Sequence, residues 1–187
     1  MLWLVAIALG LVVGLVTGGS IDSFASVRFR RPLVLLAAVV IREAVLLTPL
    51  NRLDAMRYVY VVALAAIVAW TIWHFDLLPG VWLVTAGGAL NLLVIGVNGA
   101  RMPVAPALAG PLLSHGDVAQ YTLMGPGTNL GGLGDWISVP PFPEAYSLGD
   151  VVIAAGLAVV VFFITRRPTR AETDGAETSR RIVSDPP

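Results

Sequence analysis

The chain has 187 residues, 57% of them hydrophobic and only 13% charged, and its formal net charge at pH 7 is zero. A water-soluble domain of this size could not hide so much apolar surface, so we expect lipid to be the solvent for much of the chain. Zero net charge argues against a nucleic-acid partner, which normally leaves a basic footprint on the protein. The absence of cysteine excludes disulfides, thiolate metal sites and cysteine nucleophiles.

Five segments are apolar and long enough to be predicted as membrane-spanning helices, because about 20 residues are needed to cross ~30 Å of hydrocarbon. They cover residues 2–18, 32–50, 57–75, 78–97 and 149–165. The first is expected to be retained rather than cleaved, since it lacks the basic region of a signal peptide and leads into more apolar sequence. The expected fold class is therefore an all-α integral membrane protein with five transmembrane helices.

Arginine placement predicts the orientation, because cytoplasmic loops carry the positive excess. Three arginines follow the first segment and three follow the fifth, against three on the opposite side. All twelve basic residues are arginine, which is typical of a GC-rich bacterial genome. We predict a multi-pass protein of the bacterial plasma membrane with its N-terminus outside. Residues 168–187 alternate arginine with acidic residues, so they are expected to be a disordered cytoplasmic tail.

Small and polar residues mark the first and fourth segments. Gly10, Gly14 and Gly18 recur every four residues, which puts them on one helix face that another backbone can approach closely. That face predicts helix packing within the chain or, alternatively, contact with a second copy or another membrane protein. Asn91 lies inside the fourth segment, where its amide needs a partner. It is expected to bond another helix or, alternatively, to line a solute path.

Arg42 and Glu43 lie near the middle of the second segment, where a charged side chain is costly and marks a functional candidate. Adjacent residues do not face each other on a helix, so we do not expect the two simply to neutralise one another. Each is expected to find a partner on another segment, or the helix breaks there. Structural pairing and a functional site both remain open.

Residues 99–148 connect the fourth and fifth segments, and so long a connection is usually functional. Its many prolines and glycines prevent a continuous helix, while its tryptophan, phenylalanine and tyrosine argue against disorder. We predict a compact extracytoplasmic cap with short helical turns. The connection opens on a helix stop with an interfacial arginine, formed by Asn98, Arg101, Met102 and Pro103.

The candidate catalytic groups lie in the cap and at the start of the fifth segment. His115 is accompanied by only one other histidine in the chain, so no metal site and no cofactor are predicted. Ser147 followed by Asp150 is a capping-box pattern, in which the serine caps the last helix and the carboxylate complements its dipole. Alternatively, Asp135 and Asp150 share a proton and activate a water for peptide hydrolysis.

Four elements of the sequence resemble the pattern of a family of small bacterial membrane proteins, catalogued as domain of unknown function 5317. They are Asn98-Gly99-Ala100-Arg101-Met102-Pro103-Val104, His115, Leu133-Gly134-Asp135 and Ser147-Leu148-Gly149-Asp150. The resemblance covers nearly the whole chain up to about Arg167. It implies a polytopic bacterial membrane protein and assigns no activity.

A weaker likeness is to bacterial lipoprotein signal peptidases, in which one catalytic aspartate lies outside the membrane and another precedes the last helix. By position, Asp135 and Asp150 are similar to that pair. The sequence departs from that family's pattern, however. Ser147 replaces an asparagine and Gly149 an alanine. The other signature element has no clean match, and the number of helices differs.

Taken together, these patterns favour a non-enzymatic binding, regulatory or accessory membrane component that engages lipid, a small ligand or another membrane protein. The alternative is an aspartyl membrane peptidase that uses Asp135 and Asp150. A third hypothesis is transport of a small solute past Arg42, Glu43 and Asn91, which needs an oligomer because five helices are few for a transporter.

Overall fold

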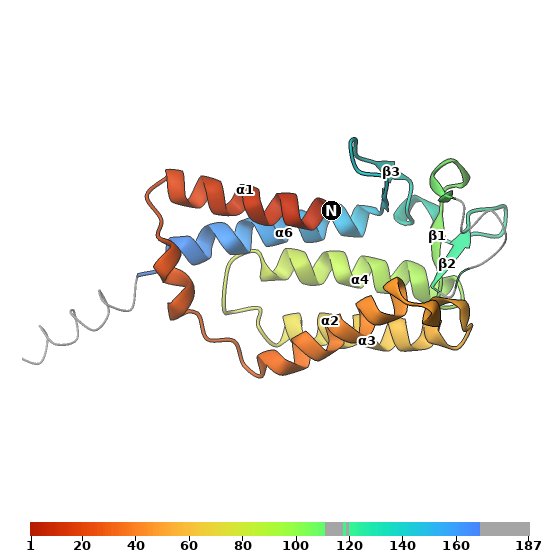
Figure 1. The fold of residues 1–187 in the computed structure, drawn as a ribbon, viewed down its shortest axis with the longest axis horizontal. Helices are drawn as coiled ribbons and strands as arrows, with labels where there is room; N and C mark the ends of the chain where they lie inside the picture. Colours follow the sequence, from red (N-terminus) through yellow and green to blue (C-terminus); the bar gives the residue numbers. More distant parts are fainter. Residues whose placement is uncertain (111–117, 119, 169–187) are drawn as a thin grey trace, which may run out of the picture.

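The computed structural model describes residues 1–110, 118 and 120–168. Its α-helices run side by side, and short strands gather at the end of the bundle where the chain begins (Figure 1). The helices in the described part of the chain are α1 (Leu2–Val16), α2 (Pro32–Leu47), α3 (Met56–Ile72), α4 (Val81–Val97) and α6 (Leu148–Thr165). His115 and residues 169–187 of the predicted tail lie outside the described residues.

The prediction of five transmembrane helices is wrong. Among the described residues, only α6 combines the length and the hydropathy of a helix that could cross a membrane. The apolar helices α1, α3 and α4 have 15, 17 and 17 residues, which is short of the ~20 that ~30 Å of hydrocarbon requires. α2 has 16 residues and runs unbroken through Arg42 and Glu43.

Apolar residues in the turns explain the overestimate. The fourth expected segment begins at Leu78, but α4 begins only after Gly80, whose φ of +95° is open to glycine and strained for other residues. The second expected segment runs to residue 50, but α2 ends at Leu47, two residues before Pro49 opens a short 3₁₀ turn, η2 (Pro49–Arg52). Hydropathy counts such residues as membrane-spanning, although their backbone is not helical.

The helices pack in an arc, with α1 on α6, α6 on α4, α4 on α3 and α3 on α2 (Figure 1). Gly10 and Gly14 face α6 within the chain. A Cβ on Gly10 would lie 2.3 Å from the carbonyl oxygen of Ala158, and one on Gly14 would lie 2.2 Å from Oγ1 of Thr165. Gly18 follows the helix and has open space around it. The first two glycines therefore serve close packing of the first helix on the last.

The cap contains strands that the sequence did not predict. β1 (Met102–Val104) pairs in parallel with β2 (Tyr121–Leu123), and β3 (Ile137–Ser138) pairs antiparallel with β4 (Ala145–Tyr146). The expected short helical turns are present as well, as η3 (Pro106–Leu108) and η4 (Gly131–Leu133). Strands of two or three residues are too short to produce a period-two pattern, so hydrophobic periodicity could not reveal them.

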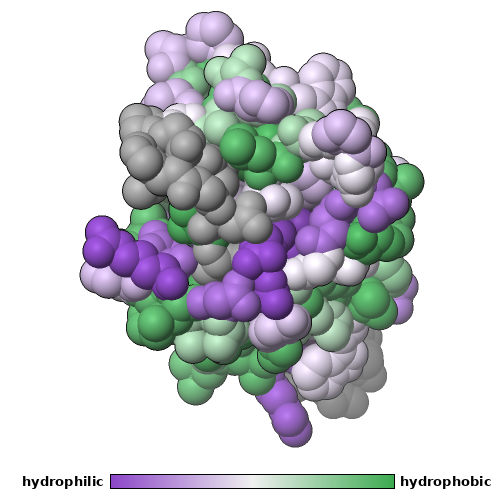
Figure 2. Space-filling view, turned by 90° about the vertical axis from the view of Figure 1, so that its right-hand side faces the viewer, coloured by the Kyte–Doolittle hydropathy of each residue, from purple (hydrophilic) through white to green (hydrophobic). Residues whose placement is uncertain are grey.

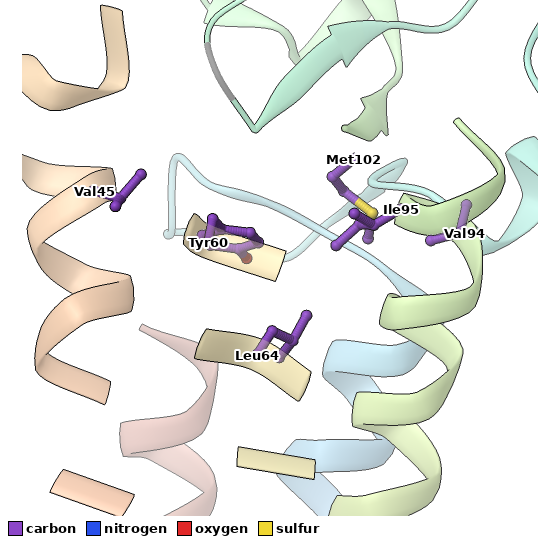
Figure 3. Close-up of a cluster of buried hydrophobic side chains, with 6 residues drawn as sticks. All are labelled: Val45, Tyr60, Leu64, Val94, Ile95 and Met102. Carbon is purple, nitrogen blue, oxygen red and sulfur yellow. The ribbon is translucent and has the colours of Figure 1, made fainter. Parts of the chain in front are cut away.

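A hydrophobic core joins the bundle to the cap. Met102 of β1 lies beside Ile95 of α4 in one cluster of buried side chains (Figure 3), whose other members are Val45 from α2, Tyr60 and Leu64 from α3, and Val94 from α4. Burial of these side chains draws β1 onto the end of the bundle, because each fully buried large apolar side chain contributes roughly 1.5–3 kcal/mol. The position of β1 in turn places the rest of the cap.

Gly10→Ala tests the contact between α1 and α6. The added methyl group would overlap the backbone at Ala158, so we expect the free energy of unfolding to fall by about 1–3 kcal/mol, as overpacked sites do. The measurement is a denaturant titration of the protein in detergent. Gly96→Ala in α4 is the matched control, because a Cβ there meets nothing within 4 Å and the unfolding free energy should hold or rise. Equal losses in both variants would contradict this packing.

Candidate functional site

A buried amide in α4 holds the start of α6. Asn91 is buried, and its Nδ2 donates a hydrogen bond of 3.0 Å to Oδ1 of Asp150. The hydroxyl of Ser147 donates a hydrogen bond of 2.8 Å to Oδ1 of the same amide. Gly149 packs against this amide so closely that a Cβ would lie 2.0 Å from Oδ1 of Asn91. The junction therefore depends on the N-cap residue of α6, Ser147, and on Gly149 and Asp150 in its first turn.

The capping box expected at the start of α6 is present. The amide N–H of Asp150 donates to Oγ of Ser147 at 2.9 Å, and the amide N–H of Ser147 donates to Oδ2 of Asp150 at 3.1 Å. The negative charge also lies at the positive end of the helix dipole. Because Oδ1 accepts from Asn91, both carboxylate oxygens of Asp150 are engaged in holding the helix.

Asp135 occupies a different environment. Its side chain is 6% exposed, and its Oδ1 has no hydrogen-bond partner among the described residues. Its backbone extends the pairing of β1, because its N–H donates to the carbonyl of Pro103 and its carbonyl accepts from Ala105, each at 2.8 Å. No hydrogen bond within the described part of the chain joins Asp135 to Asp150.

Burial sets the protonation of Asp135. Loss of hydration raises the pKa of its carboxyl from 3.8 to about 8, repulsion from Asp150 adds to the rise, and Arg42 opposes it. The group is therefore mostly protonated at neutral pH. The two carboxylates feel each other electrostatically, but their hydrogen bonds give them different roles.

A pocket of about 300 Å³ lies between the cap and the end of α2, and we refer to it as the cap pocket. Its polar lining includes Asp135, Gln120, Tyr121, Asn51 and Glu144, and the remaining wall is mainly apolar. Gln120 is 2% exposed, and its Oε1 also lacks a hydrogen-bond partner within the described residues. Two residues that line one pocket therefore each carry a buried acceptor oxygen without a partner among the described residues.

Sequence reasoning missed most of this pocket. Gln120, Tyr121 and Asn51 carry no motif, and only the pairing of β1 with β2 brings the first two beside Asp135. Burial raises the pKa of the Tyr121 phenol well above its usual value, so this group stays neutral. Of the residues that line the pocket, the sequence analysis had selected only Asp135 as a candidate site residue.

Arg42 forms a second polar cluster, whose residues are not among those that line the cap pocket. Its guanidinium pairs with Glu43, donates a hydrogen bond of 3.2 Å to the hydroxyl of Tyr60 and lies over the ring of Trp3 at 5.3 Å. The expectation that Arg42 and Glu43 would not neutralise one another is wrong, because the long arginine side chain reaches its neighbour. The expected partners on other helices are present for the arginine.

The motif after α4 connects the bundle to the cap. Nδ2 of Asn98 donates to the carbonyl of Asn129 at 2.8 Å, and the N–H of Asn129 donates back to Oδ1 at 2.9 Å. Arg101 forms an ion pair with Asp54 near the start of α3. Met102 enters the core, and Pro103 is fully buried. Through these contacts, the residues of the predicted helix stop anchor the cap to the bundle.

A family described as "Family of unknown function (DUF5317)" matches residues 26–162, which is more than half of the chain. The chain belongs to this family. The resemblance inferred from the motifs is thereby confirmed. Searches of the curated proteins and of the solved structures each found no match. The part of the chain that matches DUF5317 contains the Asn91 junction, the whole lining of the cap pocket and, apart from Trp3, the Arg42 cluster.

The cap end of this DUF5317 protein carries a mixed surface. Hydrophilic residues gather across the middle of this face, and hydrophobic residues flank them (Figure 2). Within the described residues, no group of three or more histidine, cysteine or acidic side chains is arranged to hold a metal ion. The candidate site is therefore the cap pocket, with the Asn91 junction as its support.

Asn91→Ala tests that support. Loss of the amide removes one hydrogen bond from the Ser147 hydroxyl and one from Oδ1 of Asp150 at this buried junction, so we expect a loss of about 1–3 kcal/mol in the free energy of unfolding. Leu93→Ala on the half-exposed side of the same helix should change this free energy far less. A double-mutant cycle with Asp150→Ala should show a coupling energy, and strictly additive losses would refute the junction.

Asp135→Asn tests the buried carboxyl through pH. Between pH 4 and pH 8 the unfolded carboxyl is ionised while the folded one keeps its proton, so stability falls as pH rises by up to about 1.4 kcal/mol per unit. We expect wild type to show this fall and Asp135→Asn to lack it in denaturant titrations at pH 5, 6, 7 and 8. Asp22→Asn, which changes an exposed carboxyl, should keep the wild-type slope. Identical profiles in wild type and Asp135→Asn would rule out a buried, protonated carboxyl.

Proposed function

We propose that the protein is a membrane-associated, non-enzymatic component that binds a small ligand in the cap pocket. The observation that carries this proposal is the pair of buried acceptors, Oδ1 of Asp135 and Oε1 of Gln120, which lack partners among the described residues and belong to two residues that line one pocket. An unsatisfied buried polar group costs about 1–3 kcal/mol. A ligand that donates hydrogen bonds to both oxygens would recover much of this free energy, so the pocket favours such a ligand.

The apolar surface of the bundle supports a place in the membrane. α6 is long and apolar enough to cross a bilayer, and large apolar side chains on other helices are open to the surroundings. Val16 is 81% exposed, Leu33 is 75% exposed and Val62 is 68% exposed. Apolar surface on this scale favours a lipid environment over water. The compartment we propose is the bacterial plasma membrane.

The arrangement of the ends supports an orientation with the cap outside. The start of the chain lies beside the cap: the Met1 amino group is 3.6 Å from the carboxylate of Glu144 (Figure 1). At the opposite end, Arg167 donates a hydrogen bond to the carbonyl of Leu77, and the N–H of Arg30 donates to His74. Arginines near that end favour the cytoplasmic side.

Two other functions have less support. A peptidase would need Asp135 and Asp150 to share one water. In favour of this function, the two carboxyl groups are near enough for Asp150 to raise the pKa of Asp135. Both oxygens of Asp150 are engaged by Asn91 and the capping box, however, which favours a structural role. Transport past Arg42 and Asn91 would need a polar path, and no hydrogen bond in the described part of the chain joins their two clusters. Both functions stay predictions.

A ligand screen tests the proposal. Purified protein in lipid nanodiscs is tested against small polar compounds for a saturable rise in unfolding temperature, which reports binding to the folded state. For a compound that binds, we expect Gln120→Leu to weaken the affinity at least about tenfold, because it removes one hydrogen-bond acceptor. Asp22→Asn should leave the affinity unchanged.

Leu108→Trp supplies a second check, because it fills the pocket without changing either acceptor and should also abolish binding. Saturable binding that survives both Gln120→Leu and Leu108→Trp would contradict the proposal, and so would a screen without any binder. Cleavage of a membrane peptide by the wild-type protein, lost in a stably folded Asp150→Asn variant, would establish the peptidase instead.

A further inference from the structure

We infer that the ligand of the cap pocket is a compact organic cation, whose ammonium group takes the place of a proton at Asp135 while its hydrocarbon body fills the apolar part of the pocket. This inference rests on the proposed function and names the chemical class of its ligand. Three features of the pocket carry it: the type of polar group that lacks a partner, the balance of charge around it, and the nature of its walls.

Once Asp135 is ionised, the unpartnered groups call for a donor. Both are oxygens, on Asp135 and Gln120, and neither has a donor within reach among the described residues. An ammonium offers three N–H donors and no acceptor, so it can bond both oxygens without leaving a lone pair buried. A hydroxyl brings only one donor, and a carboxylate or phosphate brings acceptors alone. Among these three kinds of group, the inventory of atoms therefore favours the ammonium.

The charge balance points the same way. Asp150 of α6 repels the carboxylate of Asp135, and Glu144 lines the same pocket beside β4, so two more carboxyl groups contribute negative charge near this site. Tyr60 from α3 and Tyr121 from β2 interact electrostatically with Asp135 as neutral phenols.

The one cation that acts on Asp135 from these elements is Arg42 of α2, and it already pairs with Glu43. At the edge, Glu144 hydrogen bonds the Tyr146 hydroxyl at 2.6 Å and lies 3.6 Å from the Met1 amino group. A further anion would be repelled, and a cation would be attracted.

The walls define the rest of the ligand. Leu46, Val104, Leu108, Ala109 and Val118 line the pocket with apolar side chains. Its volume of about 300 Å³ is at the small end for ligand sites, so the body must be compact. Bare inorganic cations would leave this apolar space unfilled. The pocket thus matches a small alkyl or cycloalkyl ammonium.

Binding of such a cation moves one proton. The protonated carboxyl of Asp135 loses its proton to solvent, and the carboxylate that remains pairs with the ammonium, so charge and atoms balance. Below the pKa of about 8, each ammonium bound should therefore release close to one proton. The apparent affinity should rise about tenfold per pH unit up to that pKa and then level off.

Cyclohexylamine and cyclohexanol are the probes, because they share a ring and differ in charge and donor count. Titration calorimetry on the full chain in nanodiscs, at pH 6, 7 and 8 in two buffers of different ionisation enthalpy, gives affinity and proton release together. We expect the amine to bind at least about tenfold more tightly than the alcohol at pH 8, since a charge-assisted bond is stronger than a neutral one. The affinity for the amine should also rise with pH.

Two variants separate the release of the proton from the binding of the ligand. Asp135→Asn should abolish both the pH dependence and the proton release, whereas Gln120→Leu should weaken binding and keep the pH dependence. Asp22→Asn is the matched control and should behave as wild type. Should Asp135→Asn fail to fold, the pair of wild type and Gln120→Leu still decides, because proton release by these two proteins alone reports the exchange.

Two outcomes would refute the inference and leave the proposed function intact, and a third would refute both. Equal binding of cyclohexanol without proton release would show a pocket for neutral ligands and refute the cation. Displacement of the amine by potassium at equal concentration would show a bare-cation site and refute the organic class. If neither probe nor any compound of the screen binds, the ligand-binding function itself fails.

Discussion

The hydrogen bonds between Asn91 and the first turn of α6 fix the geometry on which the candidate site depends. α4 leads into the cap through Asn98 and Met102, and α6 leaves it through Ser147. Because Asn91 bonds both Ser147 and Asp150, the chain enters and leaves the cap on two helices held together. The two ends of the cap are thereby held together, and in the described part of the cap β1 pairs in parallel with β2 beside the cap pocket.

Local patterns in the sequence were sufficient to predict features whose hydrogen bonds join residues close together in the chain. Ser147 and Asp150 predicted the capping box because its two hydrogen bonds join residues three apart. α6 begins at Leu148, one residue before the expected segment. Helix length was less predictable, since apolar residues such as Leu78 continue into turns that glycine and proline terminate. That is why apolar stretches suggested membrane-spanning helices longer than α1, α3 and α4 are.

The cap pocket could not be predicted because its parts are far apart in sequence. Asn51 follows α2, Gln120 precedes β2 and Asp135 precedes β3, and none of them belongs to a motif that joins it to the others. Asp135 was selected only as a possible partner of Asp150. Its burial, which decides its protonation, arises from the packing of the cap on the bundle and leaves no trace in the neighbouring residues.

The docking of α1 on α6 has a consequence for biosynthesis. The glycine face of α1 is made first, but the surface that it covers belongs to the last helix of the bundle. During translation this face must wait until α6 has left the ribosome, so the arc closes in a late step between distant segments. A nascent chain arrested before α6 would keep the glycine face of α1 without the helix on which it packs.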